Sequence, residues 1–436
     1  MSKHPDSSGS VLDRRSVRRL YRLGGVCAAA LLTVWWYTTH TNPSVTIPNP
    51  VLPTPNAFDF YVRAANAITE KRNLEAAVSK HPTVHFSTAQ KQEIVRQNAR
   101  AIDTLHAGLA YPYLNPPVRS LSDDTVYYPK FRSVAHLLLL QGQTRAENGD
   151  WADATESDLD VMQMGEEVPH GAPIIGALTG ISLQAMGREA MWKVVEHLNV
   201  EQSRAAIQRL SGLMERHVPM ADSIQEEKWL GQAERMEIFN RVFKPTPEEK
   251  AEPPRSTGGS FVLDLLYFFQ SKKRIMSDFT VYMDQNAQQA RQPYSLHLPS
   301  PREPTDFLNR FLQPVFLYSE LRDANSETQN GFLLVTLALH AYRLEHHHYP
   351  ASLMELTPEY LEKLPEDPFI ARDTFKYRVE GEGYVLYSVG PDGKDDGGRM
   401  IDDPKHAESP DSTNPNARYF VAQNSVGDVV AGKNTW

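Results

Sequence analysis

The sequence predicts a mainly helical α+β protein with an N-terminal membrane anchor, an irregular α-helical domain, and a C-terminal long helix followed by a small antiparallel sheet. Three observations carry this prediction. An arginine-rich segment precedes an uncharged apolar run near the N-terminus, apolar residues then recur at helical spacing, and two short alternating runs near the C-terminus have strand spacing. With 436 residues and 41% hydrophobic content, the chain is long enough for two or three units.

Charge is unevenly distributed along the chain. The net charge is −9, so the sequence offers no electrostatic footprint for nucleic acid. Positive charge is concentrated in residues 1–22, where only two aspartates oppose five arginines, Arg14, Arg15, Arg18, Arg19 and Arg22. This asymmetry favours a membrane as partner, with the basic segment on the cytoplasmic side.

Residues 23–39 form the predicted membrane anchor. The run LGGVCAAALLTVWWY has no charge and ends in aromatic residues, which are typical of a membrane interface. It is shorter than the ~20 residues that a spanning helix needs. A cleaved signal peptide is the alternative, although TTHTNPS offers no clear small-x-small cleavage site. The sole cysteine, Cys27, lies inside this run, so the remainder of the chain has neither disulfides nor thiolate metal sites.

Residues 40–55 contain a proline every few positions, which predicts a semi-rigid spacer. The helical domain, residues 56–243, should begin with Asn56 as the cap of a helix that buries Phe58, Tyr61, Ala65 and Ile68. Further helices are expected at 89–109, 130–148, 151–165, 172–198, 200–217 and 220–243. The segment LLLLQGQTRAENGDWADATESDLDVM is similar to one tetratricopeptide unit, with Gly142 at a close helix contact, Asn148-Gly149-Asp150 as the turn, and Ala154 and Leu159 packing back. A helical repeat array needs at least three such units. We therefore expect a single α-α hairpin, and the alternative is a full array.

The C-terminal half is predicted to begin with a linker at 244–260, rich in proline, glycine and charge, and a helical connection at 261–300. Asp306 should cap a helix, and a long helix should then run to about His346 with Phe332, Val335, Leu339 and Tyr342 on one face. Strands are expected at 375–379 and 384–389, joined through Gly381. The tail, residues 411–436, contains RYFVA and DVVAG, either of which would suit an edge strand.

Several motifs follow one another in an uncommon order after the long helix. They are Tyr349-Pro350, then Leu353 and Leu356, then Asp367-Pro368, then the run YSVGPDG that ends at Gly393. Over residues 305–410 this order resembles the C-terminal domain of the major pseudopilin of bacterial type II secretion systems, in which a long helix, a D-P turn, a small antiparallel sheet and a calcium loop follow in turn. The resemblance implies a bacterial inner-membrane protein whose bulk lies in the periplasm. The chain departs from that family because it lacks the pilin leader, and Gly331-Phe332 opens a stretch too short and too polar for a pilin stem.

The best candidate site is the acidic loop, residues 392–403. Carboxylates recur in it between glycines, which suits a calcium ion that takes six to eight oxygen ligands; they are Asp392, Asp395, Asp396, Asp402 and Asp403. The alternative is a solvated turn with Lys394 and Arg399 as counter-charges. The loop departs from the EF-hand pattern because Lys394 occupies the third position.

Two other clusters suggest a metal or catalytic site but are better explained as structural features. The run His346-His347-His348 would suit zinc, but adjacent helical residues point in different directions, which favours a polar helix end. A group of glutamates alternates with Lys228 and Arg235, the pattern of a solvated helix face: Glu226, Glu227, Glu234 and Glu237. Motifs for nucleotide binding or hydrolysis are absent from the sequence, and no small-molecule substrate is identified.

The sequence leaves two functions open. The first is a non-enzymatic binding or scaffold component of the bacterial envelope, with other envelope or secretion proteins as partners. The second is an exported enzyme that acts on an envelope polymer, with its active site in the helical domain. A cleft with clustered, pKa-shifted carboxylates would favour the enzyme, and an exposed apolar groove would favour binding.

Overall fold

The computed structural model describes residues 14–69, 71–78, 85–120, 127–241, 271–294, 301–311, 319–404 and 415–434. It is mainly helical with one three-stranded antiparallel sheet, which confirms the predicted fold class at that level. The predicted linker at 244–260 and the first ten residues of the helical connection lie outside the described residues, as do residues 1–13.

The chain divides into two compact units. The first unit comprises Met1–Thr46, Glu234–Val281 and Glu303–Leu312, and the second comprises Ile47–Ala233, Tyr282–Arg302 and Gln313–Trp436. This division differs from the predicted domain boundaries. Helices from 151–214, the long helix and the sheet share one hydrophobic core inside the second unit, so the predicted helical domain and the pseudopilin-like segment are packed together.

In the first unit, helix α1 (Arg14–His40) contains the predicted anchor, and its exposed apolar side chains include Val26, Leu31, Leu32, Val34 and Trp36. Within the described part of the chain, no helix is both long and apolar enough to cross a membrane. Elsewhere in this unit, Phe239 packs with Ile275, Met276 and Leu308. Arg235 is fully buried here with its guanidinium 3.5 Å from the ring centroid of Phe279, so the prediction that its helix face is solvated was wrong at this position.

The second unit contains a stack of helices whose bounds are α2 (Ala57–Ala67), α3 (Lys71–Ala77), α4 (Thr88–Gln97), α5 (Ala99–Leu109), α6 (Tyr127–Glu147), α7 (Trp151–Glu167), α8 (Ile174–Val194), the 3-10 helix Val195–His197 and α9 (Val200–Met214). Helix α10 (Met220–Arg241) and helix α12 (Lys272–Gln289) each have one part in this unit. Asn56 caps α2 as predicted, since its side chain accepts a hydrogen bond from the backbone N–H of Phe58.

The helix expected at 89–109 is broken into two at Asn98. This buried side chain accepts a hydrogen bond from the backbone N–H of Thr69 at 2.8 Å and donates one to the carbonyl of Ile94. At the break the backbone N–H of Asn98 donates to Val95, and the side chain of Asn98 replaces it as the donor to the Ile94 carbonyl. Helix α3, which the sequence did not predict, begins two residues after Thr69, the backbone partner of Asn98.

The predicted hairpin of α6 and α7 is confirmed. A Cβ at Gly142 would lie 2.7 Å from Oδ1 of Asp158 and 3.3 Å from the carbonyl of Ala154, so glycine suits this close approach of the two helices. Gly149 has a positive φ of 85° in the turn, and Ala154 and Leu159 are fully buried. Helices α7 and α8 approach more closely still, because a Cβ at Gly180 would meet the backbone carbonyl of Gly165 at 2.5 Å.

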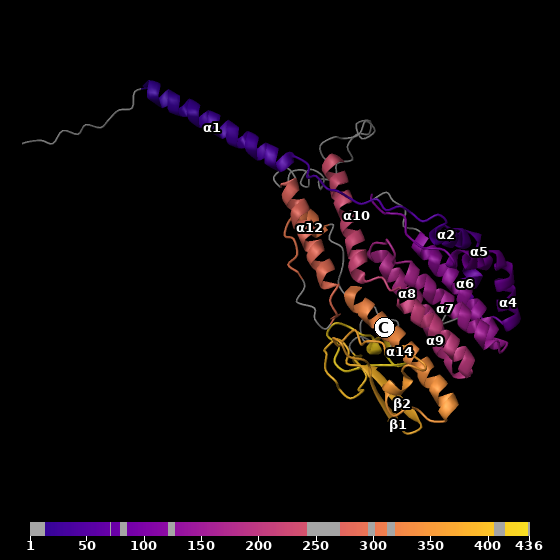
Figure 1. Cartoon of the computed structure of the whole chain (residues 1–436). Helices are drawn as coiled ribbons and strands as arrows, with labels where there is room; N and C mark the ends of the chain where they lie inside the picture. The colour runs from indigo at the N-terminus through magenta and orange to yellow at the C-terminus, as the bar shows by residue number, and fades with distance from the viewer. Residues whose placement is uncertain are drawn as a thin grey trace, which may run out of the picture. The chain divides into compact units, whose positions relative to one another are not determined.

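The C-terminal part of the second unit is built on α14 (Ser319–His346), which ends where the sequence predicted. Helices α8 and α9 cover one side of α14 and the sheet covers another (Figure 1). Every residue from Phe332 to Leu339 is therefore buried, a wider apolar surface than the single predicted face. Asp306 caps helix α13 (Phe307–Phe311) in the first unit by accepting a hydrogen bond from the N–H of Asn309.

The sheet has the order β1 (Lys376–Glu380), β2 (Gly383–Ser388) and β3 (Val429–Val430). Lys376 pairs with Tyr387 in β2, and Tyr387 pairs in turn with Val430, so all three strands are antiparallel. The edge strand thus comes from DVVAG, while the RYFVA segment begins in the 3-10 helix Pro415–Tyr419. The Leu-rich segment expected after Tyr349-Pro350 is the 3-10 helix Leu353–Leu356, with a capping box from Ser352 and Glu355.

Candidate functional site

The five aspartates of the acidic loop bond to different protein groups. Asp392 accepts a hydrogen bond from the N–H of Lys394, and Asp395 accepts one from the hydroxyl of Tyr387 at 3.0 Å. Asp396 accepts a hydrogen bond from Arg399, and Asp402 accepts two from Arg418, one from Nε and one from a terminal nitrogen. The backbone N–H of Asp403 donates a hydrogen bond to the carbonyl of Arg418.

A sixth aspartate, Asp428, forms hydrogen bonds to the backbone of the loop. The sequence had indicated this residue only as part of a possible edge strand. Asp428 is fully buried, and its carboxylate accepts hydrogen bonds from the backbone N–H groups of Asp396 at 3.2 Å and Gly398 at 2.6 Å. Burial raises the pKa of Asp428, and these two hydrogen bonds act against the rise. A hydrogen-bonding carboxylate beneath the loop therefore fixes its backbone.

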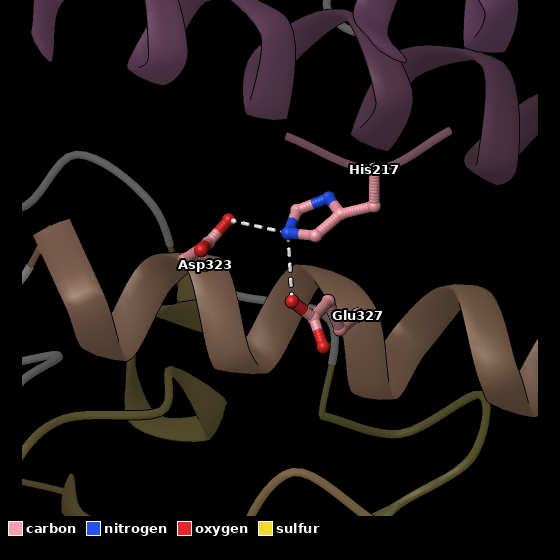
Figure 2. A group of neighbouring side chains, drawn as sticks. All are labelled: His217, Asp323 and Glu327. Atoms are coloured by element: carbon pink, nitrogen blue, oxygen red, sulfur yellow. Dashed lines mark ion pairs between the residues drawn. The ribbon is translucent and has the colours of Figure 1, made fainter. Parts of the chain in front are cut away.

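The described residues contain a single group of three His, Cys, Asp or Glu side chains whose ligand atoms lie within 4.8 Å of one another, and it is not in the acidic loop. It consists of His217, Asp323 and Glu327. His217 lies in the connection between α9 and α10, and the two carboxylates lie four residues apart on α14, which places them on one face of that helix (Figure 2). The loop aspartates thus have suitable oxygen atoms for calcium, but those oxygens do not converge.

Both carboxylates of the group face the same imidazole nitrogen. Nε2 of His217 lies 2.7 Å from Oε1 of Glu327 and 3.6 Å from Oδ1 of Asp323. On the other side of the ring, Nδ1 lies 3.6 Å from Oε2 of Glu166 on α7. Burial by itself lowers the pKa of His217, but the three carboxylates, led by Asp323, raise it well above its usual value. The surrounding carboxylates therefore favour the protonated imidazole.

Glu166 belongs to a buried polar seam that joins α7, α8 and α14. The charge of Glu166 is opposed by Arg188 on α8, which donates a hydrogen bond to Oδ1 of Asn330 at 2.6 Å. The side chain of Gln184 in turn accepts hydrogen bonds from Asn330 at 2.8 Å and from Ser326 at 3.1 Å. All five residues are buried, so these polar groups hold the three helices in one register.

The His217 group lies beside a pocket of about 200 Å³, since Asp323 and Glu327 both line it. The other charged lining residues are Glu320, Glu366, Asp367 and Arg372. Acidic side chains outnumber the single arginine, so the pocket suits a cation better than an anion.

Asp367, from the predicted Asp367-Pro368 turn, is the most deeply buried carboxyl in the pocket wall. Its Oδ1 atom accepts hydrogen bonds from the N–H of Phe369 at 2.9 Å and from the hydroxyl of Ser388 at 2.8 Å. Its buried Oδ2 atom accepts no hydrogen bond from the described residues. Burial raises the pKa of Asp367 to about 6.

Sequence reasoning missed this site for a physical reason. The i, i+4 spacing of Asp323 and Glu327 on a predicted helix was readable, but His217 joins them from a loop distant in the chain. The histidine run and the glutamate group that the sequence singled out make structural contacts instead. His346 lies against the ring of Tyr342 at the end of α14, and Glu227 accepts a hydrogen bond from the N–H of Ile174 at the start of α8.

Comparison of the chain with models of known protein families, with curated proteins and with solved structures found no significant match.

Proposed function

We propose that this protein is a membrane-anchored component of the bacterial envelope that binds or scaffolds other envelope or secretion proteins from the periplasmic side. The supporting observation is the order of elements after residue 319. A long helix, a D-P turn, a small antiparallel sheet and a glycine-rich acidic loop follow one another, as in the pseudopilin head. The arginine-rich segment before the apolar part of α1 supports the anchor, with the N-terminus in the cytoplasm.

The packing of α14 favours a fixed component over a subunit of a pseudopilus. Helices α8 and α9 cover the side of α14 that the sheet leaves free, and Leu333, Leu334 and Leu337 are buried there as well as the predicted face. A subunit that assembles through its long helix would need part of that helix free for other copies. In this chain the helix is instead the centre of a core shared with the helical stack.

Calcium is proposed as a ligand of the acidic loop, through Asp392, Asp395, Asp396, Asp402 and Asp403. Their oxygens are of the type that calcium prefers. Because Asp402 pairs with Arg418 and Asp396 with Arg399, calcium would have to displace these arginines to gather the carboxylates. Binding would therefore reorder the loop above Asp428.

The proposal is tested with the full chain in two measurements. Expressed in a bacterium, the chain should remain in the inner-membrane fraction after alkaline extraction, and a variant without residues 1–40 should be released; release of the full chain would contradict the anchor. In a thermal melt, calcium at a hundredfold excess over its dissociation constant should stabilise the fold by about 2.7 kcal/mol. Asp392→Ala should abolish that gain and Glu382→Gln, in the exposed β1–β2 turn, should keep it. A melt unaffected by calcium would mean that the loop is a solvated turn.

A second function is favoured by the pocket beside His217. Two groups with raised pKa values, Asp367 in the pocket wall and His217 beside two other wall residues, are typical of an active site, which supports an exported enzyme acting on an envelope polymer. The small volume would admit only one group of such a polymer. Turnover of purified cell-wall polymer by the full chain, lost in Asp367→Asn and kept in Glu382→Gln, would favour the enzyme over the scaffold.

A further inference from the structure

We propose that His217, Asp323 and Glu327 bind a divalent transition-metal cation of the zinc class, with an open coordination position facing the pocket. The site is separate from the acidic loop, and it depends on neither function proposed above. The three ligand atoms lie within 4.8 Å of one another in a part of the chain where the sequence predicted no metal.

The donor set selects the class of metal. One imidazole nitrogen with two carboxylate oxygens suits zinc and its neighbours in the first transition row, whereas calcium and magnesium prefer oxygen alone. Two donors at ~2.05 Å from zinc in tetrahedral geometry lie ~3.3 Å apart. The distances from Nε2 of His217 to the two carboxylates, 2.7 and 3.6 Å, bracket that value. Small side-chain shifts would therefore bring all three atoms to one ion.

Glu166 supplies the second observation. This side chain is 96% buried, its Oε2 atom accepts no hydrogen bond from the described residues, and the atom lies 3.6 Å from Nδ1 of His217. A carboxylate behind a metal-binding histidine holds a proton on Nδ1, which leaves the lone pair of Nε2 for the metal. Figure 2 shows Nε2 directed at Asp323 and Glu327, with the other ring nitrogen on the opposite side.

The charges of the site are balanced when a metal is present. A divalent cation neutralises Asp323 and Glu327 while the imidazole is neutral, and Glu166 is opposed by Arg188. A bound divalent ion would therefore compensate both carboxylates of the group.

The open position follows from the pocket. Asp323 and Glu327 are wall residues of the pocket, so an ion held between them and His217 is reached from it. Three protein ligands leave a fourth zinc position for water or for a ligand atom, as is typical of sites that are not purely structural. Asp367, whose Oδ2 accepts no hydrogen bond from the residues that the structure describes, lies in the wall of the same pocket.

The competing explanation is a simple ion pair between a histidine cation and two carboxylates. It accounts for the short distance between His217 and Glu327. It accounts for Glu166 as well, because a protonated imidazole also carries a hydrogen on Nδ1, which lies 3.6 Å from Oε2 of Glu166. It leaves Oδ2 of Asp367, in the wall of the pocket, without a hydrogen bond from the described residues. The two explanations differ in whether the protein binds zinc at this group.

The test uses the purified full chain after treatment with a chelator, with equilibrium dialysis against zinc and visible absorption after loading with cobalt(II). The protein should bind one zinc, and the cobalt form should show the intense bands of a four- or five-coordinate site. His217→Gln, Asp323→Asn and Glu327→Gln should each weaken zinc binding at least tenfold. Glu320→Gln, on the same helix and in the same pocket wall, and Asp392→Ala, in the acidic loop, should bind as the parent does.

Far-ultraviolet circular dichroism and a melt show which variants are folded, and a variant that fails to fold is replaced by His217→Asn or Glu327→Asp. Absence of zinc binding at micromolar concentration would overturn the proposal. So would zinc affinity that folded His217 variants leave unchanged, because the ion would then be held elsewhere. Zinc binding that Asp392→Ala abolishes would likewise assign the ion to the acidic loop.

Discussion

The carboxylate of Asp428 accepts a hydrogen bond of 2.6 Å from the backbone N–H of Gly398, across 30 positions of sequence. The same carboxylate accepts a hydrogen bond from the backbone N–H of Asp396, so one buried side chain fixes the middle of the acidic loop. Strand β3 brings Asp428 to this position, because Val429 pairs with Ser388 at the end of β2. The tail is thus part of the architecture of the loop.

Asp428→Ala should destabilise the fold by about 1–3 kcal/mol for each backbone donor left buried without a partner. The loop should also become sensitive to proteases, since its backbone is no longer held. Urea unfolding and limited proteolysis measure the two effects. Asp392→Ala, whose side chain bonds only within its own turn, is the matched control and should change unfolding little. Equal effects from the two variants would contradict the role given to Asp428.

Asp367 should give the fold a measurable pH dependence. Its pKa is about 6 in the folded protein and near 4 in the unfolded chain, so the folded state binds the proton more tightly. The resulting stability is fully present below about pH 4 and is lost as the pH rises through 6, by roughly 2–3 kcal/mol. Asp367→Asn cannot ionise and keeps an oxygen for Phe369 and Ser388.

The measurement is urea unfolding of the parent and of Asp367→Asn at pH 4.5 and pH 7.5. Other groups titrate in both proteins, so the difference between them isolates Asp367. The parent should lose more stability than the variant over this interval. An identical loss in the two proteins would show that Asp367 does not titrate in the expected range.

Gly180→Ala should destabilise the second unit by about 1–3 kcal/mol, because the added methyl group meets a backbone carbonyl that cannot move away alone. In the structure this Cβ would lie 2.5 Å from the oxygen of Gly165. Gly212→Ala on α9 is the control and should change stability in the opposite direction, since its Cβ would meet nothing within 4 Å. Replacing a helical glycine there should stabilise the protein by about 0.5–1 kcal/mol. Thermal unfolding of the two variants should move in opposite directions, and a neutral Gly180→Ala would disprove the close contact of α7 and α8.

The local signals in the sequence predicted most elements, and contacts between distant segments account for what it missed. Caps at Asn56 and Asp306 and the turn at Gly149 involve neighbouring residues, and each forms as expected. The break at Asn98 depends on Thr69, a partner that sequence spacing does not reveal.

The candidate site follows the same rule. Asp323 and Glu327 share a helix face that periodicity predicts, but periodicity does not bring His217 and Glu166 to them. The packing of α9 against α14, and of α7 against α8 and α9, does so, and it rests on a core in which no single residue carries a signature. In the acidic loop the aspartates were visible as a cluster, whereas the buried Asp428 lay outside it in the tail.

The electrostatic interaction of Arg188 with Glu166 should show coupling in a double-mutant cycle. Arg188→Met leaves Oδ1 of Asn330 without its donor and weakens the compensation of the buried Glu166 charge, which should cost about 1–3 kcal/mol. Glu166→Gln removes that charge, so the double variant should be more stable than the sum of the two single losses predicts, by about 1–3 kcal/mol. Arg96→Met with Glu93→Gln is the exposed control pair on α4, and its coupling should be much smaller because solvent screens it. Additive losses for Arg188 and Glu166 would mean that Asn330, which accepts the hydrogen bond from Arg188, and not the buried carboxylate, holds the guanidinium in place.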